Sequence, residues 1–355
     1  MNWFRIRIVV GALVLCPLLF FSLSCAKTEP GPPPVTKAPE EVVERRVNFL
    51  AVGDIMLSRG VARSIARSGN DPLTPFKKMA DVFRSTDFNF GNLESPISGN
   101  DNVFGKGLVF NASTRDRVGL KEFNFKMLNL ANNHAMDQGL KGLRQTKKYL
   151  EEDGLSFIGT GENLDEAWQP RVLEVKGVKI GFVGASYASV NDGGVARNEY
   201  VARMEDTARL KTAIEQLKAQ NVDFIVATMH AGIEYTRRPN NTQTDFARAA
   251  IDYGADIVIG AHPHWAQVFE KYKDKYIFYS LGNFIFDQTW SRDTMEGLAL
   301  KIHLLNRKSS ASQTTVEKIE LLPVVIENAS TPRLANDAEA RQILQKMGVA
   351  EKVLQ

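Results

Sequence analysis

Short apolar runs rich in Val, Ile, Leu and Phe alternate along this chain with longer segments whose apolar residues recur at helical spacing. The runs at residues 47–53, 125–130 and 155–159 predict buried strands. The segments between them, at 61–68 and 140–152, predict amphipathic helices. Strands that alternate with helices in this way indicate an α/β protein.

The second half of the chain continues the alternation. Two short β-prone runs flank Lys176 and Gly177, and together they predict a hairpin. The hairpin strands are expected at 171–175 and 179–183, later strands at 222–228, 256–260, 276–281, 297–305 and 316–322, and helices at 207–220, 245–253 and 337–347.

The first residues have the layout of a secretory signal. Arg5 and Arg7 precede an almost wholly apolar run at residues 8–24. The run ends at Cys25, and this end resembles a bacterial lipoprotein signal, in which the cysteine is lipidated and becomes the mature N terminus. Ser22 departs from that pattern, because an aliphatic residue usually stands three places before the cysteine.

We therefore expect residues 1–25 to be a lipoprotein-type signal segment, with Cys25 as the lipidation site. An uncleaved membrane anchor stays open as an alternative, because the apolar run is almost long enough to span a bilayer. Plain cleavage of the signal stays open as well. All three alternatives export the protein, and the first attaches it to a cell membrane of the bacterial envelope.

The chain after the signal is expected to have three parts. Residues 26–46 are rich in Pro, Glu, Lys and Thr, and they predict an extended tether. The folded domain is expected at 47–322, followed by a C-terminal helical extension at 323–355. Both cysteines, Cys16 and Cys25, precede the domain, which therefore has neither a disulfide nor a catalytic thiol.

The charge balance argues against one class of partner. The 44 Lys and Arg residues nearly balance the 41 Asp and Glu residues, and the formal net charge is +3. The basic residues are scattered along the chain, whereas nucleic-acid binding requires a concentrated basic face. We therefore expect no nucleic-acid partner.

Short polar clusters contain four of the five histidines, and those that can be placed follow apolar, β-prone runs. Side chains at strand ends can converge on one spot. Asp, Glu, Asn and His together suit a pair of hard-to-borderline metal ions, so the pattern favours a dinuclear metal hydrolase. The clusters lie at residues 53–54, 91–94, 132–134, 230–232 and 260–264.

The order of the clusters resembles that of the metallo-dependent phosphatases, whose motifs run D-x-H, G-D-x-x-D, G-N-H-[DE], a lone His and G-H-x-H. The chain is still more similar to the CapA-type poly-gamma-glutamate capsule biosynthesis family, over about residues 47–305. The segments that carry this likeness are AVGDIML (51–57), GNLESPI (91–97), LANNHAMDQG (130–139), HAGIEY (230–235), GAHPHWAQ (260–267) and YSLGNFIFDQ (279–288).

The resemblance implies a metallo-dependent phosphatase-like fold, which is a four-layer α-β-β-α sandwich. It also implies two divalent metal ions, with Mn, Fe or Zn as candidates and Glu94 as the bridging carboxylate. His134 follows the ligand Asn133, so it is expected to act as general acid or oxyanion stabiliser, with Asp137 orienting its ring. The implied metal ligands are Asp54, Glu94, Asn133, His230, His262 and His264.

Two positions depart from the superfamily pattern. Met56 stands where the first motif carries its histidine, so one metal site loses a nitrogen ligand. Glu94 replaces the bridging Asp of the superfamily, which changes the reach of that carboxylate. Phosphoesterase activity therefore does not follow from the resemblance alone.

Other polar residues in or near the motifs are candidates for binding substrate. Some also have a structural interpretation, such as a turn for Asn132, an ion pair for Arg59 or a loop contact for Asn283. Trp265 and Trp290 are either the wall of a groove or the exposed edge of the core. The substrate-binding candidates are Arg59, Asn92, Asn132, Glu234, Tyr235 and Asn283.

Two functions are compatible with these expectations. The first is an exported, phosphoesterase-like hydrolase that acts on an anionic polymer of the capsule or envelope, or on its precursor. The bond cleaved is a phosphoester or an amide. The alternative is a non-catalytic component of capsule assembly or export that holds an anionic polymer in the same groove. Expected partners are that polymer, the membrane through the lipid anchor, and other membrane proteins of capsule synthesis.

Overall fold

The computed structural model describes residues 42–99, 108–187, 199–308 and 313–355. The expected signal segment, Cys25 and most of the expected tether lie outside these ranges. Within them, no helix combines the length and the apolar character that crossing a bilayer requires.

The larger of two sheets contains nine strands. β1 (Val43–Ile55) lies in the middle, with parallel strands on one side; on the other side a long antiparallel strand pairs with residues 43–51 and a short parallel strand with residues 54–55. The order is β14 (Thr331–Leu334), β13 (Gln313–Glu327), β12 (Glu296–Lys308), β1, β2 (Phe88–Leu93), β3 (Phe125–Asn129) and β4 (Ser156–Ile158), while β11 (Asn283–Ile285) pairs with β1 and β15 (Val353–Leu354) with β13.

The smaller sheet contains six strands and includes the predicted hairpin. Lys176 and Gly177 at its turn have φ angles of 51° and 75°, which suit a tight two-residue connection. The strand order is β5 (Arg171–Val175), β6 (Val178–Ser186), β7 (Phe224–His230), β8 (Ile257–Ala261), β10 (Lys275–Phe278) and β9 (Phe269–Tyr272).

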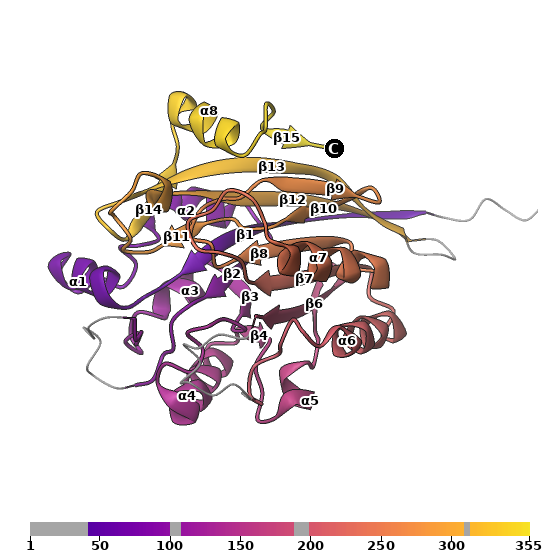
Figure 1. The fold of residues 1–355 in the computed structure, drawn as a ribbon, viewed down its shortest axis with the longest axis horizontal. Coiled ribbons are helices and arrows are strands. Elements are labelled where there is room, and N and C mark those ends of the chain that lie inside the picture. Colours follow the sequence, from indigo (N-terminus) through magenta and orange to yellow (C-terminus); the bar gives the residue numbers. More distant parts are fainter. Residues whose placement is uncertain (1–41, 100–107, 188–198, 309–312) are drawn as a thin grey trace, which may run out of the picture. The chain divides into compact units, whose positions relative to one another are not determined.

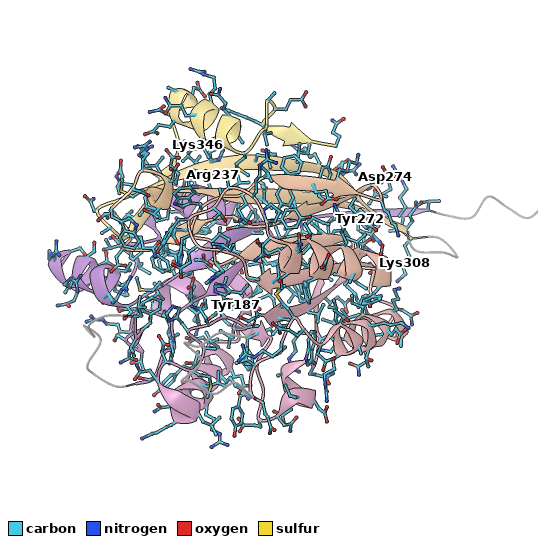
Figure 2. All side chains as sticks on the ribbon, in the orientation of Figure 1. Tyr187, Arg237, Tyr272, Asp274, Lys308 and Lys346 are labelled. Carbon is cyan, nitrogen blue, oxygen red and sulfur yellow. The ribbon has the colours of Figure 1, made fainter. Side chains whose placement is uncertain are left out.

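An apolar layer joins the two sheets. Phe90 of β2 stacks on Phe182 of β6, with ring centroids 5.7 Å apart. Phe49 and Phe88 stack in the same layer at 4.9 Å, and both are fully buried. Side chains fill the space between the sheets (Figure 2). The alternating apolar residues of β1 and β2 therefore form the inner face of the larger sheet.

Helices cover the outer face of each sheet (Figure 1). On the larger sheet, the Phe83 ring packs 5.4 Å from that of Phe125; on the smaller sheet, Leu217 and Ala250 are buried. The predicted α-β-β-α sandwich is confirmed. The helices are α1 (Arg59–Arg67), α2 (Ala80–Arg84), α3 (Val118–Glu122) and α4 (Gly139–Glu152) on the larger sheet and α5 (Leu164–Ala167), α6 (Thr207–Ala219) and α7 (Asn241–Tyr253) on the smaller, with short 3-10 turns η1 (Lys77–Met79) and η2 (Asp293–Met295).

The C-terminal region differs from the separate helical extension predicted at 323–355. β13 continues to Glu327 and β14 follows it, so the sheet runs beyond the predicted end of the domain. α8 (Asp337–Lys346), yellow in Figure 1, buries Ile343 in the same apolar layer as Ile319 of β13. The helix is therefore part of the domain and covers a portion of the inner face of the larger sheet.

Two elements, β1 and α7, begin four residues earlier than predicted. β1 begins at Val43, inside the expected tether, because its first residues pair with the end of β12 although they are exposed. α7 begins at Asn241 rather than at residue 245. Its start is set by a capping box, in which Asn240 and Gln243 satisfy each other's backbone N–H groups.

Candidate metal centre

The predicted ligands lie at the carboxyl ends of strands from both sheets. Asp54 is the penultimate residue of β1, Glu94 follows β2, and His230 ends β7. His262 and His264 follow β8. All five side chains are at most 4% exposed, so they meet in a buried region between the ends of the two sheets.

Strand register explains why Asp54 lies among amides. Asn283 of β11, Asn92 of β2 and Asn129 of β3 form one row with Asp54, because each is the register partner of its neighbour. Asn92 Nδ2 donates to Asp54 Oδ1 at 2.8 Å, and Asn129 Nδ2 donates to Asn92 Oδ1 at 2.9 Å. This amide row therefore holds the Asp54 carboxylate in one orientation.

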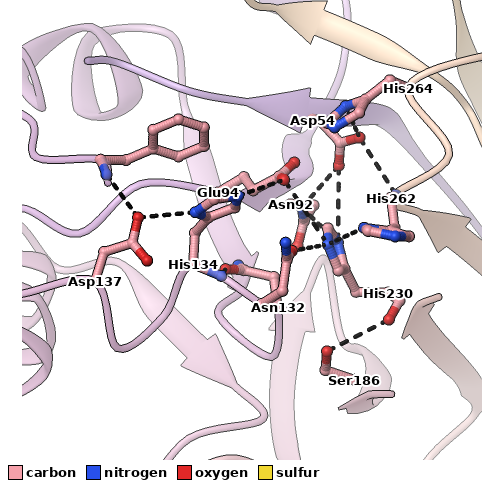
Figure 3. Close-up of polar contacts among 12 residues, drawn as sticks. Asp54, Asn92, Glu94, Asn132, His134, Asp137, Ser186, His230, His262 and His264 are labelled. Carbon is pink, nitrogen blue, oxygen red and sulfur yellow. Dashed lines mark hydrogen bonds and ion pairs between the residues drawn. The ribbon is translucent and has the colours of Figure 1, made fainter. Parts of the chain in front are cut away.

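The donor atoms form two groups, and Glu94 belongs to both (Figure 3). One group contains Glu94, His230 and His262, and the other contains Asp54, Glu94 and His264. Within each group the donor atoms lie within 4.8 Å of one another. Glu94 would therefore be a ligand common to both groups when divalent metal is bound.

Asn133 joins the first group through His230. Asn133 Oδ1 lies 2.7 Å from His230 Nε2, and His262 Nδ1 lies 3.1 Å from the same nitrogen. Asn92 Nδ2 lies 3.1 Å from the other ring nitrogen, Nδ1. The contact with Asn92 therefore orients the ring so that Nε2 is directed into the donor group.

The Glu94 carboxylate shows that the site fits a cation. It is fully buried, and neither oxygen has a hydrogen-bond partner among the described residues. Burial, and after it the charge of Asp54, raises the pKa of Glu94 well above its usual range. A buried carboxylate without a partner destabilises a fold by several kcal/mol, and a bound cation would offset this cost.

The three histidines of the two groups are neutral and available as ligands. Burial, followed by the charges of neighbouring histidines, lowers the pKa of His230 and His262 well below the usual range. Burial lowers the pKa of His264 to about 3 and raises that of Asp54 to about 7. Metal binding would therefore displace protons from carboxyl groups and not from imidazolium ions.

The metal-free protein is expected to be most stable near pH 6.5, the ordinary pKa of histidine. Below this pH, the three unfolded histidines bind protons that the folded ones do not bind, and this loss of stability outweighs the opposite effect of the two carboxyl groups. Above it, only the carboxyl groups still titrate, and their raised pKa values make stability fall as they ionise.

Urea denaturation in chelator, from about pH 5 to 9, measures this effect, at roughly 1.4 kcal/mol per pH unit for each proton. Saturating Mn²⁺ is expected to move the maximum to higher pH, because the metal requires ionised carboxylates. A metal-free maximum at about pH 8 or above would contradict the assigned protonation states.

His134 forms a dyad with Asp137. His134 Nδ1 lies 2.8 Å from Asp137 Oδ2, and the backbone N–H of Phe110 donates to the same oxygen at 2.6 Å. The Phe110 ring stacks on the imidazole, with centroids 3.9 Å apart. These contacts fix the ring, and Nε2 lies 3.8 Å from Glu94 Oε1. His134 is therefore placed beside the donor groups, where the predicted general acid is required.

Arg59, a predicted substrate contact, interacts with the protein itself. Its guanidinium donates to Asp287 Oδ1 at 2.5 Å and lies over the Phe110 ring, 4.6 Å from the centroid. The other Asp287 oxygen accepts the backbone N–H of Gly60 at 2.8 Å. Because Phe110 also stacks on His134, Arg59 supports the dyad, and its ion pair with Asp287 is the structural role that the sequence left open beside a substrate contact.

Three other predicted substrate contacts are buried amides, at most 3% exposed. Asn92 lies in the amide row described above. Asn132 Oδ1 accepts the backbone N–H of His134 at 3.1 Å. Asn283 Oδ1 lies 2.9 Å from Nδ1 of His264. These amides position the ligands and the dyad, in line with the structural roles left open for Asn132 and Asn283, and their contact with substrate stays a prediction.

Glu234 and Tyr235 lie at the rim of the site. Glu234 is exposed, and Tyr235 is half-buried with its ring centroid 6.0 Å from that of His264. The backbone N–H of Tyr235 donates to the carbonyl oxygen of Pro263 at 2.8 Å, which ties this loop to the ligand loop. Both residues stay candidates for substrate binding.

The ligand loop after β8 is held in an uncommon conformation. His262 and His264 have φ angles of 101° and 57°. Such angles cost residues with a Cβ roughly 1–3 kcal/mol and persist where surrounding contacts enforce them.

Met56, which replaces the histidine of the superfamily, is fully buried in the helix-facing core. The second donor group therefore contains a single histidine, His264, and no nitrogen ligand from position 56.

Three residues that contact the site were not predicted. The Tyr187 ring lies 4.8 Å from that of His262, and Phe110 stacks on His134. Phe110 follows a stretch without helix or strand periodicity, so no pattern singles it out. Asn129 had a usable signal, because it is a polar residue inside a β-prone run that otherwise predicts a buried strand.

The chain is similar to known proteins in sequence and in structure. A family described as "Bacterial capsule synthesis protein PGA_cap" matches residues 48–288. "Capsule biosynthesis protein CapA" of Bacillus anthracis is 31% identical over 310 residues, covering 85% of this chain and 73% of that protein. "PGA biosynthesis protein CapA" of Bacillus subtilis is 33% identical over 290 residues, covering 81% and 73%. The solved calcineurin-like phosphoesterase YfkN of Bacillus subtilis matches with a TM-score of 0.46 and 13% identity, covering 86% of this chain and 97% of that one.

Proposed function

The chain belongs to the bacterial capsule synthesis protein family PGA_cap, and we propose that it is a metal-dependent hydrolase of the phosphoesterase type. In this proposal, its substrate is an anionic polymer of the capsule or envelope, such as poly-gamma-glutamate, or a precursor of that polymer. The observation that carries the proposal is the buried Glu94 carboxylate, which two donor groups share.

A role in polymer binding alone does not account for this carboxylate. A groove that only holds a polymer gains nothing from a fully buried acid whose oxygens have no hydrogen-bond partner among the described residues. Burial of that charge weakens the fold unless a cation is bound. The neutral histidines around it also supply nitrogen donors of the type that Mn, Fe and Zn accept.

In this proposal, different residues of the site have different roles in hydrolysis. Divalent ions held by the two donor groups would polarise a phosphoryl or carbonyl oxygen of the substrate. As water adds to the phosphorus or the carbonyl carbon, the charged His134 ring gives its Nε2 proton to the leaving oxygen or nitrogen, while Asp137 holds Nδ1. Phe110 and Arg59 keep the plane of the imidazole fixed, and the amide row keeps Asp54 in place.

Metal content and hydrolysis of the purified full chain test this proposal. Elemental mass spectrometry after chelator-free purification is expected to find Mn, Fe or Zn. Turnover of p-nitrophenyl phosphate, bis(p-nitrophenyl) phosphate and γ-glutamyl p-nitroanilide separates phosphoester from amide hydrolysis. Bound metal without any turnover would favour the alternative, a non-catalytic component of capsule assembly or export. No metal, even after add-back, would contradict the metal centre itself.

We also propose that Cys25 carries a lipid that attaches the protein to a membrane outside the cytoplasm, where other proteins of capsule synthesis would be its neighbours. The apolar run that ends at Cys25 motivates this. Cys25→Ala is expected to abolish incorporation of labelled fatty acid and to release or mislocalise the protein, as measured by fractionation. Cys16→Ala serves as the matched control. Wild-type protein that takes up no label would favour the uncleaved anchor.

A further inference from the structure

Three aromatic side chains gather at the edge of the candidate metal centre. Tyr235 lies in the loop after β7, Trp265 in the loop after β8 and Trp290 in the loop after β11. The Tyr235 ring makes edge contacts with both indoles, with centroids 6.4 Å from Trp265 and 6.0 Å from Trp290. These three residues are called the aromatic rim.

The aromatic rim is continuous with the second donor group. The Tyr235 ring lies nearly parallel to that of His264, at an interplanar angle of 28°. Tyr235 has a left-handed φ of 62°, and its backbone N–H donates to Pro263 in the ligand loop. A residue with a Cβ keeps this conformation only where contacts hold it, so the ring is fixed beside the centre.

The aromatic rim leaves large apolar surfaces in solvent. Trp290 is 63% exposed, and Ile233, in the same loop as Tyr235, is 59% exposed. Apolar side chains gathered at the mouth of a polar site mark a place where a ligand is bound. Aromatic faces in that position suit a flat or ring-shaped part of the ligand.

The charges around the aromatic rim are of both signs, since Glu234 and Arg238 of the Tyr235 loop are both exposed. Arg237 lies over the Trp265 ring, 4.8 Å from its centroid, and forms an ion pair with Asp293, which also pairs with Lys346. Arg237 is therefore engaged within the protein. The surface thus offers a phenol hydroxyl, aromatic faces and, at Glu234, an exposed carboxylate that accepts hydroxyl donors.

We propose that the aromatic rim binds a neutral sugar ring of the substrate, next to the bond that the metal centre hydrolyses. The C–H face of a hexose packs on an aromatic ring, and its hydroxyls donate to a carboxylate such as Glu234. The indoles stand at 62° and 79° to Tyr235, so neither forms a parallel pair with the Tyr235 ring. The inference rests on the proposed function and narrows its substrate to a sugar-containing polymer or precursor, because poly-gamma-glutamate itself has no sugar ring.

Calorimetric titration of the full chain in detergent with cello-, chito- and maltohexaose tests the inference. At least one hexasaccharide is expected to bind, and Trp290→Ala is expected to weaken binding by about tenfold or more. Trp290→Tyr keeps an aromatic face and is expected to retain most of the affinity. Tyr272→Ala is the matched control, since Tyr272 ends β9 at the opposite end of the smaller sheet.

Binding of none of the three sugars to the wild type would overturn the inference. The inference would also be overturned if Trp290→Ala lost binding to AMP or to anionic vesicles but kept its binding to sugar. The titration is repeated in chelator, where sugar binding is expected to persist. Failure of the metal centre and failure of the aromatic rim are therefore told apart, because metal content is measured on the same samples.

Discussion

Glu94→Gln is expected to yield a folded protein that no longer retains divalent metal and has lost most of its hydrolysis. Glu94 is shared by both donor groups, so its loss weakens both sites at once. Removing a partner that merely supports a ligand lowers metal affinity by roughly 10–100-fold, and loss of a shared ligand is expected to exceed that. Elemental mass spectrometry and turnover of the chromogenic esters measure the two effects.

The same variant is expected to change thermal stability in opposite directions in two conditions. In chelator above neutral pH, Glu94→Gln removes a buried charge and should melt higher than wild type. With saturating Mn²⁺, the wild type gains stability from binding, and the variant does not. Glu320→Gln is the control, because Glu320 pairs with His303 outside the centre. A Glu94→Gln protein with wild-type metal content would show that the carboxylate does not bridge.

His134→Ala is expected to leave metal content near wild type and to lower hydrolysis by ~10²–10⁴-fold, the range for loss of a general acid. The reason is its geometry: Nδ1 is bound to Asp137, and the ring is stacked on Phe110. The loss should appear in kcat more than in KM, because a proton donor acts in the transition state. Normal capsule or envelope function in this variant would favour the non-catalytic alternative.

His262→Ala is expected to lower both metal content and hydrolysis, in contrast to His134→Ala. His262 Nδ1 lies 3.1 Å from His230 Nε2, inside the first donor group. His303→Ala is the matched control, since this histidine pairs with Glu320 across β12 and β13 and lies outside both groups. Equal metal loss in His134→Ala and His262→Ala would show that the assigned division of roles is wrong.

The sequence could predict that the ligands come together, because each ligand is marked by the residues next to it in the chain. Asp54 follows a β-prone run directly, and His230 comes at the end of another, so strand propensity and chemistry are read from the same few residues. Parallel neighbours bring their carboxyl ends to one edge, and the two sheets then face each other. The convergence therefore followed without knowledge of the strand order.

The roles of the amides and of Arg59 could not be predicted, because they depend on contacts between distant segments. Asn92 and Asp54 are 38 positions apart, and only the register of β2 on β1 brings them together. Arg59 is bound by Asp287, 228 positions later, through the pairing that brings β11 beside β1. The sequence left an ion pair open for Arg59 and a loop contact open for Asn283, but it could not name the partner, which packing supplies.

The centre draws on both sheets, which has a consequence for the order of folding. The carboxylates Asp54 and Glu94 come from the larger sheet, and the three histidines of the donor groups come from the smaller one. A cation bound there would link the two sheets, and its binding free energy would add to the free energy of folding. Neither sheet alone holds a complete donor group, so metal can load only after the sheets have docked. The identity of the bound ion would then depend on which metal ions are present in the compartment where the two sheets dock.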